Sequence, residues 1–247
     1  MNTKIELTMT EQGRGRSVLM LHGGGGPASI AGFAEAVSRN AHVFTPTHPG
    51  FNGTPRPEEL DSVDKLAGFY LDWIAERGLD DVLLVGFSMG GWIASAMAAR
   101  DTSRLRGVVL VNAVGITVEG ETIADVFAMN PQEIRALSFH DPDKFRFEPT
   151  PQQIAMTAAN FKTLAIYGKD MCDPHLKERL ATVNIPALVA WGESDRIVTS
   201  AYGRAYADAF ANGRYAPIAQ SGHMPQIEQP AKLLALIEEF DSALVEN

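Results

Sequence analysis

The sequence predicts an α/β fold, in which a mostly parallel central sheet is flanked by helices on both faces. Short apolar runs rich in branched residues alternate with segments whose apolar residues repeat at helical spacing. Continuous apolar runs are typical of strands buried on both faces of a parallel sheet. The alternation of the two patterns is typical of β-α-β units. A chain of 247 residues also suits one such domain with an inserted subdomain.

The first half of the chain is expected to supply most of the sheet. Strands are expected at residues 4–9 (a weak edge strand), 17–21, 42–47, 82–85 and 105–111. Helices are expected at residues 29–40, 62–77 and 91–100. Gly78 gives the second of these helices a C-terminal stop. Because a helical crossover between neighbouring strands makes them parallel, this order predicts a mostly parallel sheet.

The pattern changes between residues 115 and 183, where no clear strand appears. Three helix starts are recognisable instead, each with a proline near the first helical position. They are Asn130-Pro131 with Glu133, Thr150-Pro151 with Gln153, and Asp173-Pro174. The sequence therefore predicts a helical cap at 115–183, inserted into a core domain made of residues 1–114 and 184–247.

The sheet is expected to resume after the insertion. Residues 186–191 form a further buried strand, and Thr199-Ser200 caps a helix that reaches about residue 211. Residues 214–219 form the last strand, followed by a loop and a closing helix at 230–244. In a sheet of this kind, ligands bind at the carboxyl ends of the strands.

A G-x-S-x-G motif at residues 86–90 joins the strand at 82–85 to the helix that follows. The glycines allow a sharp turn and the close approach of neighbouring backbone, so Ser88 is held at the tip of the turn, at a helix N-terminus. A serine hydroxyl is a poor nucleophile unless a base stands nearby. The strand before and the small-residue helix after favour a nucleophile over a serine that only caps the helix.

A run of four glycines follows the strand at 17–21 and begins after His22. With almost no side chains, residues 23–26 can turn backbone N–H groups toward a small site. Beside the serine turn, this run resembles the donor loop of an oxyanion hole. His22 is either catalytic or a brace for the loop, and its place at the end of a strand favours the brace.

Two further polar residues follow late strands. Asp195 comes directly after the strand at 186–191, and His223 lies in a glycine-bounded loop after the last strand. Alone, each is an ordinary turn residue. Together with Ser88 they give the order nucleophile, acid, base at the carboxyl ends of strands.

These segments together resemble the α/β-hydrolase superfamily over nearly the whole chain outside the insertion. The matching motifs are LHGGGG (21–26), HPGFNGT (48–54), GFSMGG (86–91), PALVAWGESDRIV (186–198) and SGHMPQIEQP (221–230). The resemblance implies that Ser88 attacks a carbonyl carbon, that His223 transfers the proton, and that Asp195 orients the imidazole. It further implies that the backbone N–H groups of Gly24 and Met89 bind the oxyanion. No metal or organic cofactor is expected.

The resemblance leaves the substrate open. A small, largely apolar carboxylic ester is the leading expectation, since the insertion is rich in Phe and Met. Phe127, Phe139 and Phe161 are candidates for the substrate pocket. The LHGGGG and HPGFNG segments are also similar to those of meta-cleavage-product hydrolases, which hydrolyse carbon–carbon bonds. Those enzymes commonly carry Trp after the catalytic His, where this chain has Met224.

A third alternative is a ligand-binding receptor on the same fold. Ser88 argues against haloalkane dehalogenases and epoxide hydrolases, which need an aspartate nucleophile. Composition restricts the partners, because the formal net charge is −9 and there is no basic run. A small-molecule substrate is expected, without nucleic acid or membrane.

The N-terminus has no signal-peptide pattern, and Cys172 is the single cysteine, so a cytoplasmic protein without disulfides is expected. The insertion could equally cover the site or pair two copies in a homodimer.

Overall fold

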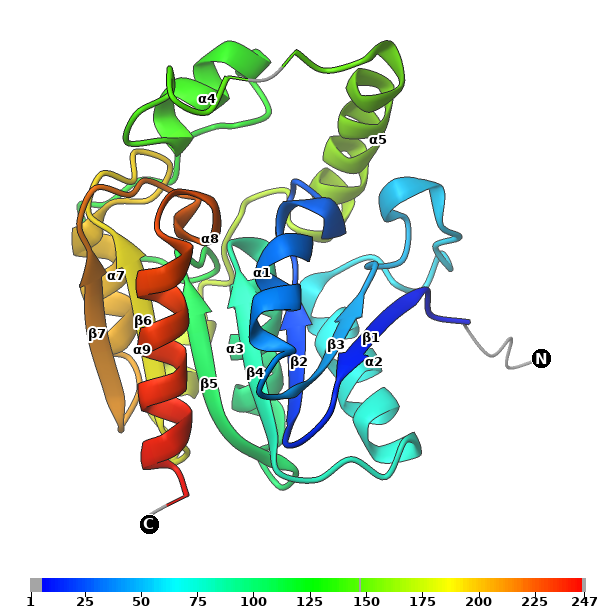
Figure 1. Cartoon of the computed structure of the whole chain (residues 1–247), viewed down its shortest axis with the longest axis vertical. Coiled ribbons are helices and arrows are strands. Elements are labelled where there is room, and N and C mark those ends of the chain that lie inside the picture. The colour runs from blue at the N-terminus through cyan, green and yellow to red at the C-terminus, as the bar shows by residue number, and fades with distance from the viewer. Residues whose placement is uncertain (1–5, 147, 246–247) are drawn as a thin grey trace.

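The computed structural model describes residues 6–146 and 148–245. These residues form one sheet of seven strands in the order β1-β3-β2-β4-β5-β6-β7. Only β1 is antiparallel to its neighbour β3, and the other pairs are parallel. The predicted fold class, a mostly parallel sheet flanked by helices, is confirmed. Figure 1 shows the strands side by side, from β7 on the left to β1 on the right, with α1 and α9 in front of the sheet.

The strands and helices alternate as β-α-β units. The strands are β1 (Met9–Gly13), β2 (Ser17–Leu21), β3 (His42–Pro46), β4 (Val82–Phe87), β5 (Leu105–Val111), β6 (Ala187–Gly192) and β7 (Gly213–Ile218). The helices are α1 (Ala31–Val37), α2 (Val63–Glu76), α3 (Met89–Arg100), α4 (Pro131–Ser138), α5 (Pro151–Tyr167), α6 (Leu176–Leu180), α7 (Ser200–Ala207), α8 (Pro225–Glu228) and α9 (Pro230–Ala243). Short 3₁₀ turns lie at Pro27–Ser29 and Phe51–Gly53.

Two hydrophobic cores lie on opposite faces of the sheet. On one face α1 and α9 cover the apolar side chains of the central strands, and on the other α2, α3 and α7 do so. The central strands β4, β5 and β6 are buried along their whole length. Their uninterrupted apolar sequences follow from this burial on both faces.

The expected strand at 4–9 is wrong in position. Residues 1–5 lie outside the described residues, and β1 runs from Met9 to Gly13 instead. Three of the five residues of β1 are exposed and none is fully buried. Because an exposed edge strand buries little apolar surface, the hydrophobic pattern did not locate it.

The insertion between β5 and β6 contains α4, α5 and α6. The first two begin as predicted, with capping boxes made by Asn130 with Glu133 and by Thr150 with Gln153. The third expected start, at Asp173-Pro174, is displaced, because α6 begins at Leu176. Figure 1 places α4 and α5 beyond the upper edge of the sheet. Within the described residues, no helix is long and apolar enough to cross a membrane.

Candidate active site

Ser88 lies at the turn between β4 and α3, with φ 52° and ψ −118°. A non-glycine residue with positive φ is uncommon, and the surrounding packing must hold it there. Glycine is required on both sides. A Cβ on Gly86 would lie 2.3 Å from the carbonyl oxygen of Gly90, and one on Gly90 would lie 2.1 Å from that of Leu21. The motif therefore packs the turn directly against β2 and leaves the half-buried Ser88 at the N-terminus of α3.

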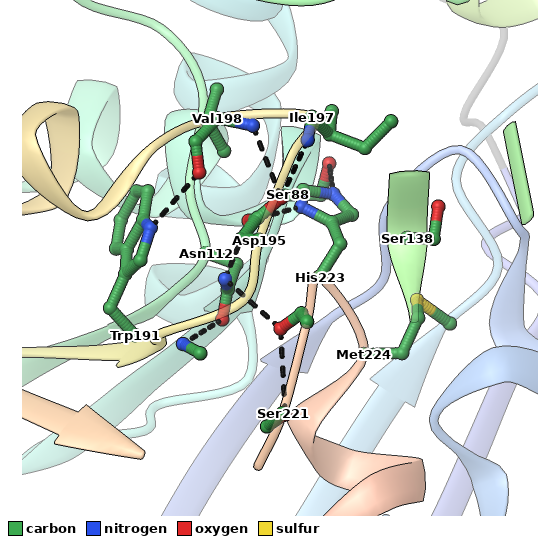
Figure 2. A network of polar contacts seen from close by, with 12 residues as sticks. Ser88, Asn112, Ser138, Trp191, Asp195, Ile197, Val198, Ser221, His223 and Met224 are labelled. Carbon is green, nitrogen blue, oxygen red and sulfur yellow. Dashed lines mark hydrogen bonds and ion pairs between the residues drawn. The ribbon is translucent and has the colours of Figure 1, made fainter. Parts of the chain in front are cut away.

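The side chains of Ser88, His223 and Asp195 form one chain of hydrogen bonds, drawn in Figure 2. His223 Nε2 lies 3.0 Å from Ser88 Oγ, and His223 Nδ1 lies 2.8 Å from Asp195 Oδ2. An ionised carboxylate can only accept, so Nδ1 carries the proton. Nε2 is then left to accept the hydroxyl proton of Ser88. The structure thus brings together the three side chains that the sequence placed on separate loops.

The carboxylate of Asp195 is buried and accepts four hydrogen bonds. Besides His223, the backbone N–H groups of Ile197 and Val198 donate to Oδ1, at 2.8 and 3.1 Å, and Asn112 Nδ2 donates to Oδ2 at 2.6 Å. The indole of Trp191 donates to the carbonyl oxygen of Val198 and braces the same loop (Figure 2). These donors fix the plane of the carboxylate and hence the direction in which it can bind the imidazole.

Asn112 is a residue that the sequence reasoning missed. It follows β5 with φ 46°, is fully buried, and accepts from the backbone N–H of Gly192 while donating to Asp195. Its Nδ2 also lies 3.4 Å from the carbonyl oxygen of Gly222, beside His223. Its place at the carboxyl end of a buried strand was the signal that could have found it.

The glycine loop after β2 packs against the serine. A Cβ on Gly23 would lie 2.9 Å from Ser88 Cβ and 3.0 Å from the carbonyl oxygen of Phe87. Within the described residues, the backbone N–H groups of Gly24 and Met89 have no acceptor. Both residues adjoin this contact in sequence, since Gly24 follows Gly23 and Met89 follows Ser88.

His22 holds this loop in place through hydrogen bonds. Its Nε2 accepts from the backbone N–H of His48 at 3.1 Å, so Nδ1 carries the proton and donates to the carbonyl oxygen of Gly23 at 2.8 Å. His48 Nε2 donates to the carbonyl oxygen of His22 at 2.9 Å, and Tyr70 donates to His48 Nδ1 at 2.6 Å. Burial lowers the pKa of His22 well below its ordinary value and lowers that of His48 to about 4. Both rings therefore stay neutral near pH 7.

The helix α5 is fastened to the loop that follows β3. Asn160 and Asn52 exchange two hydrogen bonds, at 2.8 and 2.9 Å. Thr163 donates to the carbonyl oxygen of Gly50, and Tyr167 donates to that of Pro49. Between them Leu164 reaches the glycine loop, since a Cβ on Gly24 would lie 3.0 Å from its Cδ2. One face of α5 thus contacts both the loop after β3 and the glycine loop after β2.

The three phenylalanines proposed for the pocket lie in two places. Phe127 and Phe161 contact each other edge to face, with 6.4 Å between ring centroids, and Phe127 is exposed. Phe139 stacks on Phe145 and follows Ser138, whose carbonyl oxygen accepts from the backbone N–H of His223. No contact in the described residues joins these rings to Ser88, so their part in substrate binding stays a prediction. Among residues 6–146 and 148–245, no group of three or more His, Cys, Asp or Glu side chains could hold a metal ion.

A serine on a strained strand-to-helix turn, at the carboxyl edge of a parallel sheet and bonded to a histidine from a late loop, is the arrangement of the α/β-hydrolase fold. The chain belongs to the alpha/beta hydrolase family, whose model matches residues 18–236.

Curated relatives include hydrolases and esterases over most of the chain. A 2-hydroxymuconate semialdehyde hydrolase of Pseudomonas putida is 27% identical, over 93% of this chain and 88% of the relative. A pimeloyl-[acyl-carrier protein] methyl ester esterase of Aeromonas hydrophila is 23% identical, over 96% of this chain and 99% of the relative. The chain is accordingly an α/β-hydrolase enzyme.

Solved structures agree on the fold. A meta-cleavage product hydrolase superposes with a TM-score of 0.81 at 20% identity, over 98% of this chain and 96% of the other. A thermophilic esterase of Thermogutta terrifontis superposes with a TM-score of 0.80 at 23% identity, over 97% and 94% of the two chains.

Proposed function

We propose that this enzyme is a serine hydrolase that cleaves a small, largely apolar carboxylic ester through an acyl-enzyme on Ser88. The observation that carries the proposal is the hydrogen-bonded chain from Ser88 Oγ through His223 to Asp195. A serine becomes nucleophilic when a base within hydrogen-bond reach can take its proton. Here the base is His223, whose Nε2 faces the serine hydroxyl without a proton of its own. The buried carboxylate of Asp195 orients the ring.

The proposed reaction has two halves. Ser88 Oγ attacks the ester carbonyl carbon as its proton passes to His223 Nε2, and the imidazolium then gives that proton to the departing alkoxide, which leaves as an alcohol. In the second half a water attacks the acyl-enzyme, His223 takes the proton of the water and returns it to Ser88, and the carboxylic acid leaves. Asp195 stabilises the imidazolium in both halves.

The proposed oxyanion donors are the backbone N–H groups of Gly24 and Met89. Two observations support this assignment. Within the described residues these N–H groups have no acceptor, and they lie on either side of the contact between the glycine loop and Ser88. His22 holds the carbonyl end of the peptide unit whose N–H belongs to Gly24. Removing one such donor typically costs about 10²–10³ in kcat.

We also infer that residues 115–183 act as a cap. The contacts of α5 with residues 49–52 and of Ser138 with His223 support this role, because two segments of the insertion touch the loops of the site through them. An apolar acyl group fits the Phe- and Met-rich composition of the insertion. A cytoplasmic location and the number of copies in the assembly stay predictions.

The test is hydrolysis of p-nitrophenyl acetate and butyrate by the enzyme and by Ser88→Ala. We expect turnover by the enzyme, and a loss of kcat by about 10⁴–10⁶ in the variant, because the residues of such a chain act as a unit. Ser103→Ala, on an exposed turn before β5, is the matched control and should keep full activity. Equal rates for the enzyme and Ser88→Ala would refute the proposal.

A second candidate is carbon–carbon bond hydrolysis of a meta-cleavage product. The observation that favours it is the match to the 2-hydroxymuconate semialdehyde hydrolase over nearly the whole chain. Against it stands Met224, where such enzymes commonly have tryptophan. The loss of colour of a dienoate ring-fission product separates the two, since an ester hydrolase should leave that compound intact.

A further inference from the structure

Glu228, at the end of the short helix α8, joins two segments that are far apart in the sequence. Its Oε2 accepts from the backbone N–H of Gly222 at 2.6 Å, directly before His223. Its Oε1 accepts from the backbone N–H of His140 at 2.9 Å, and more weakly from that of Asp141 at 3.4 Å. Hydrogen bonds to a charged acceptor are short and roughly twice as strong as neutral ones. One carboxylate therefore ties the loop of His223 to the chain that leaves α4.

The same part of the insertion contacts the backbone of His223 itself. The N–H of His223 donates to the carbonyl oxygen of Ser138 at 2.6 Å. The approach is close, since a Cβ on Gly222 would lie 2.3 Å from that same oxygen. Figure 2 shows Ser138 on the far side of His223 from Asp195. The backbone that carries the imidazole is thus held between the insertion and the sheet.

The loop of Asp195 is bound to the same segment. The backbone N–H of Arg196 donates to the carbonyl oxygen of Leu137 at 3.2 Å. Its guanidinium donates to the carbonyl oxygens of Ala136 and, at 2.9 Å, Phe139. These bonds satisfy carbonyls at the C-terminal end of α4, which have no partner within the helix. Residues 136–141 therefore bridge the loops of the proposed acid and the proposed base.

We propose that Glu228 is a positioning residue, which couples the seating of residues 136–141 to the position of the His223 imidazole. This inference rests on the proposed function, in which His223 is the base. Nδ1 of His223 is fixed by Asp195, but the distance from Nε2 to Ser88 also depends on where the backbone of residue 223 lies. Without the carboxylate, Gly222 and His140 lose their shared acceptor, and the loop can move away from Ser88.

A purely structural role for Glu228 would lower stability and leave the chemistry of the folded enzyme intact. A positioning role lowers kcat, because a displacement of about 1 Å in a catalytic group can cost about 10²-fold in rate. KM changes little, since Glu228 lies behind the histidine loop and binds no substrate in this proposal.

The experiment compares Glu228→Ala and Glu228→Gln with Glu239→Gln, which removes an exposed ion pair with Arg214 away from the site. Two experiments are done on each folded protein: steady-state kinetics with p-nitrophenyl butyrate, which gives kcat and KM, and backbone hydrogen exchange followed by mass spectrometry. In Glu228→Ala we expect kcat to fall about 10–100-fold with KM within about threefold. Exchange should rise together in residues 136–141 and 221–224. Glu228→Gln keeps one acceptor oxygen, so its kcat should lie between that of the unmodified enzyme and that of Glu228→Ala. If Glu228→Ala fails to fold, Glu228→Gln takes its place in the comparison.

An unchanged kcat in folded Glu228→Ala would overturn the inference. So would faster exchange confined to one of the two segments. If the unmodified enzyme does not hydrolyse the ester, the proposed function fails on that ground, and the exchange of the two segments still decides whether Glu228 couples them.

Discussion

Asn112 offers the sharpest test of how the site is held together. Asn112→Ala removes the 2.6 Å hydrogen bond to the carboxylate of Asp195 and the acceptor of the Gly192 N–H. A hydrogen bond to a charged group contributes about 1.5–3 kcal/mol, and a buried N–H left without a partner costs about 1–3 kcal/mol. Since Asn112 is fully buried, solvent does not screen these terms. We expect the free energy of unfolding to fall by about 3–4 kcal/mol.

The backbone of Asn112 allows a matched comparison. Its φ is 46°, a conformation that costs an alanine about 1–2 kcal/mol and a glycine almost nothing. Asn112→Gly removes the same hydrogen bonds without that strain. It should therefore be more stable than Asn112→Ala by about 1 kcal/mol. In both variants kcat should fall about 10–100-fold, because the carboxylate loses one of the donors that fix its plane.

Urea unfolding followed by circular dichroism gives the free energies, and p-nitrophenyl butyrate hydrolysis gives kcat. A loss of stability below about 1 kcal/mol in both variants, with kcat unchanged, would refute the reasoning that Asn112 holds the loop of Asp195.

Two further predictions concern the glycine motif and the buried histidines. Gly90→Ala should lower the free energy of unfolding by at least about 2 kcal/mol, because its Cβ would meet backbone oxygens that cannot move aside. The control is Gly32→Ala, at a helical position where a Cβ meets nothing within 4 Å, and it should raise the free energy of unfolding by about 0.5–1 kcal/mol. Urea unfolding measures the stability of both variants. Equal effects of the two substitutions would contradict the packing argument. Because the pKa of His48 is lowered to about 4 in the folded state, its contribution to stability is complete above about pH 6.5 and is lost as the pH falls toward 4, by about 3 kcal/mol. The unfolding free energy of His48→Gln should depend less on pH over that range, and parallel curves for the two proteins would be evidence against the assignment.

Much of the fold could be predicted because its signals are local. The buried strands β4, β5 and β6 are continuous apolar runs, and the capping boxes of Asn130 and Thr150 are complete within four residues. The strand β1 could not be predicted in this way, because an exposed edge strand buries little apolar surface. Its pairing with β3 depends on backbone hydrogen bonds that any sequence can make.

The meeting of Ser88, Asp195 and His223 followed from topology, since the carboxyl ends of parallel strands lie at one edge of the sheet. The residues that hold them in place were harder to find. Glu228 binds the backbone N–H groups of Gly222 and His140. Because every residue except proline has such a group, the sequence does not show which residues Glu228 contacts. The position of Asn112 directly after a buried strand was a weak indication of its role. Its partner, Asp195, lies 83 residues away along the chain.

The central claim is that Ser88 is a nucleophile activated by His223. The most direct measurement is the rate of covalent labelling by a fluorophosphonate, with the modified residue located by peptide mass spectrometry, in the enzyme and in folded His223→Gln. We expect labelling of Ser88 alone, slowed by about 10³-fold or more in the variant, since the glutamine amide cannot take the hydroxyl proton. Labelling at another residue, or an unchanged rate in His223→Gln, would contradict the account.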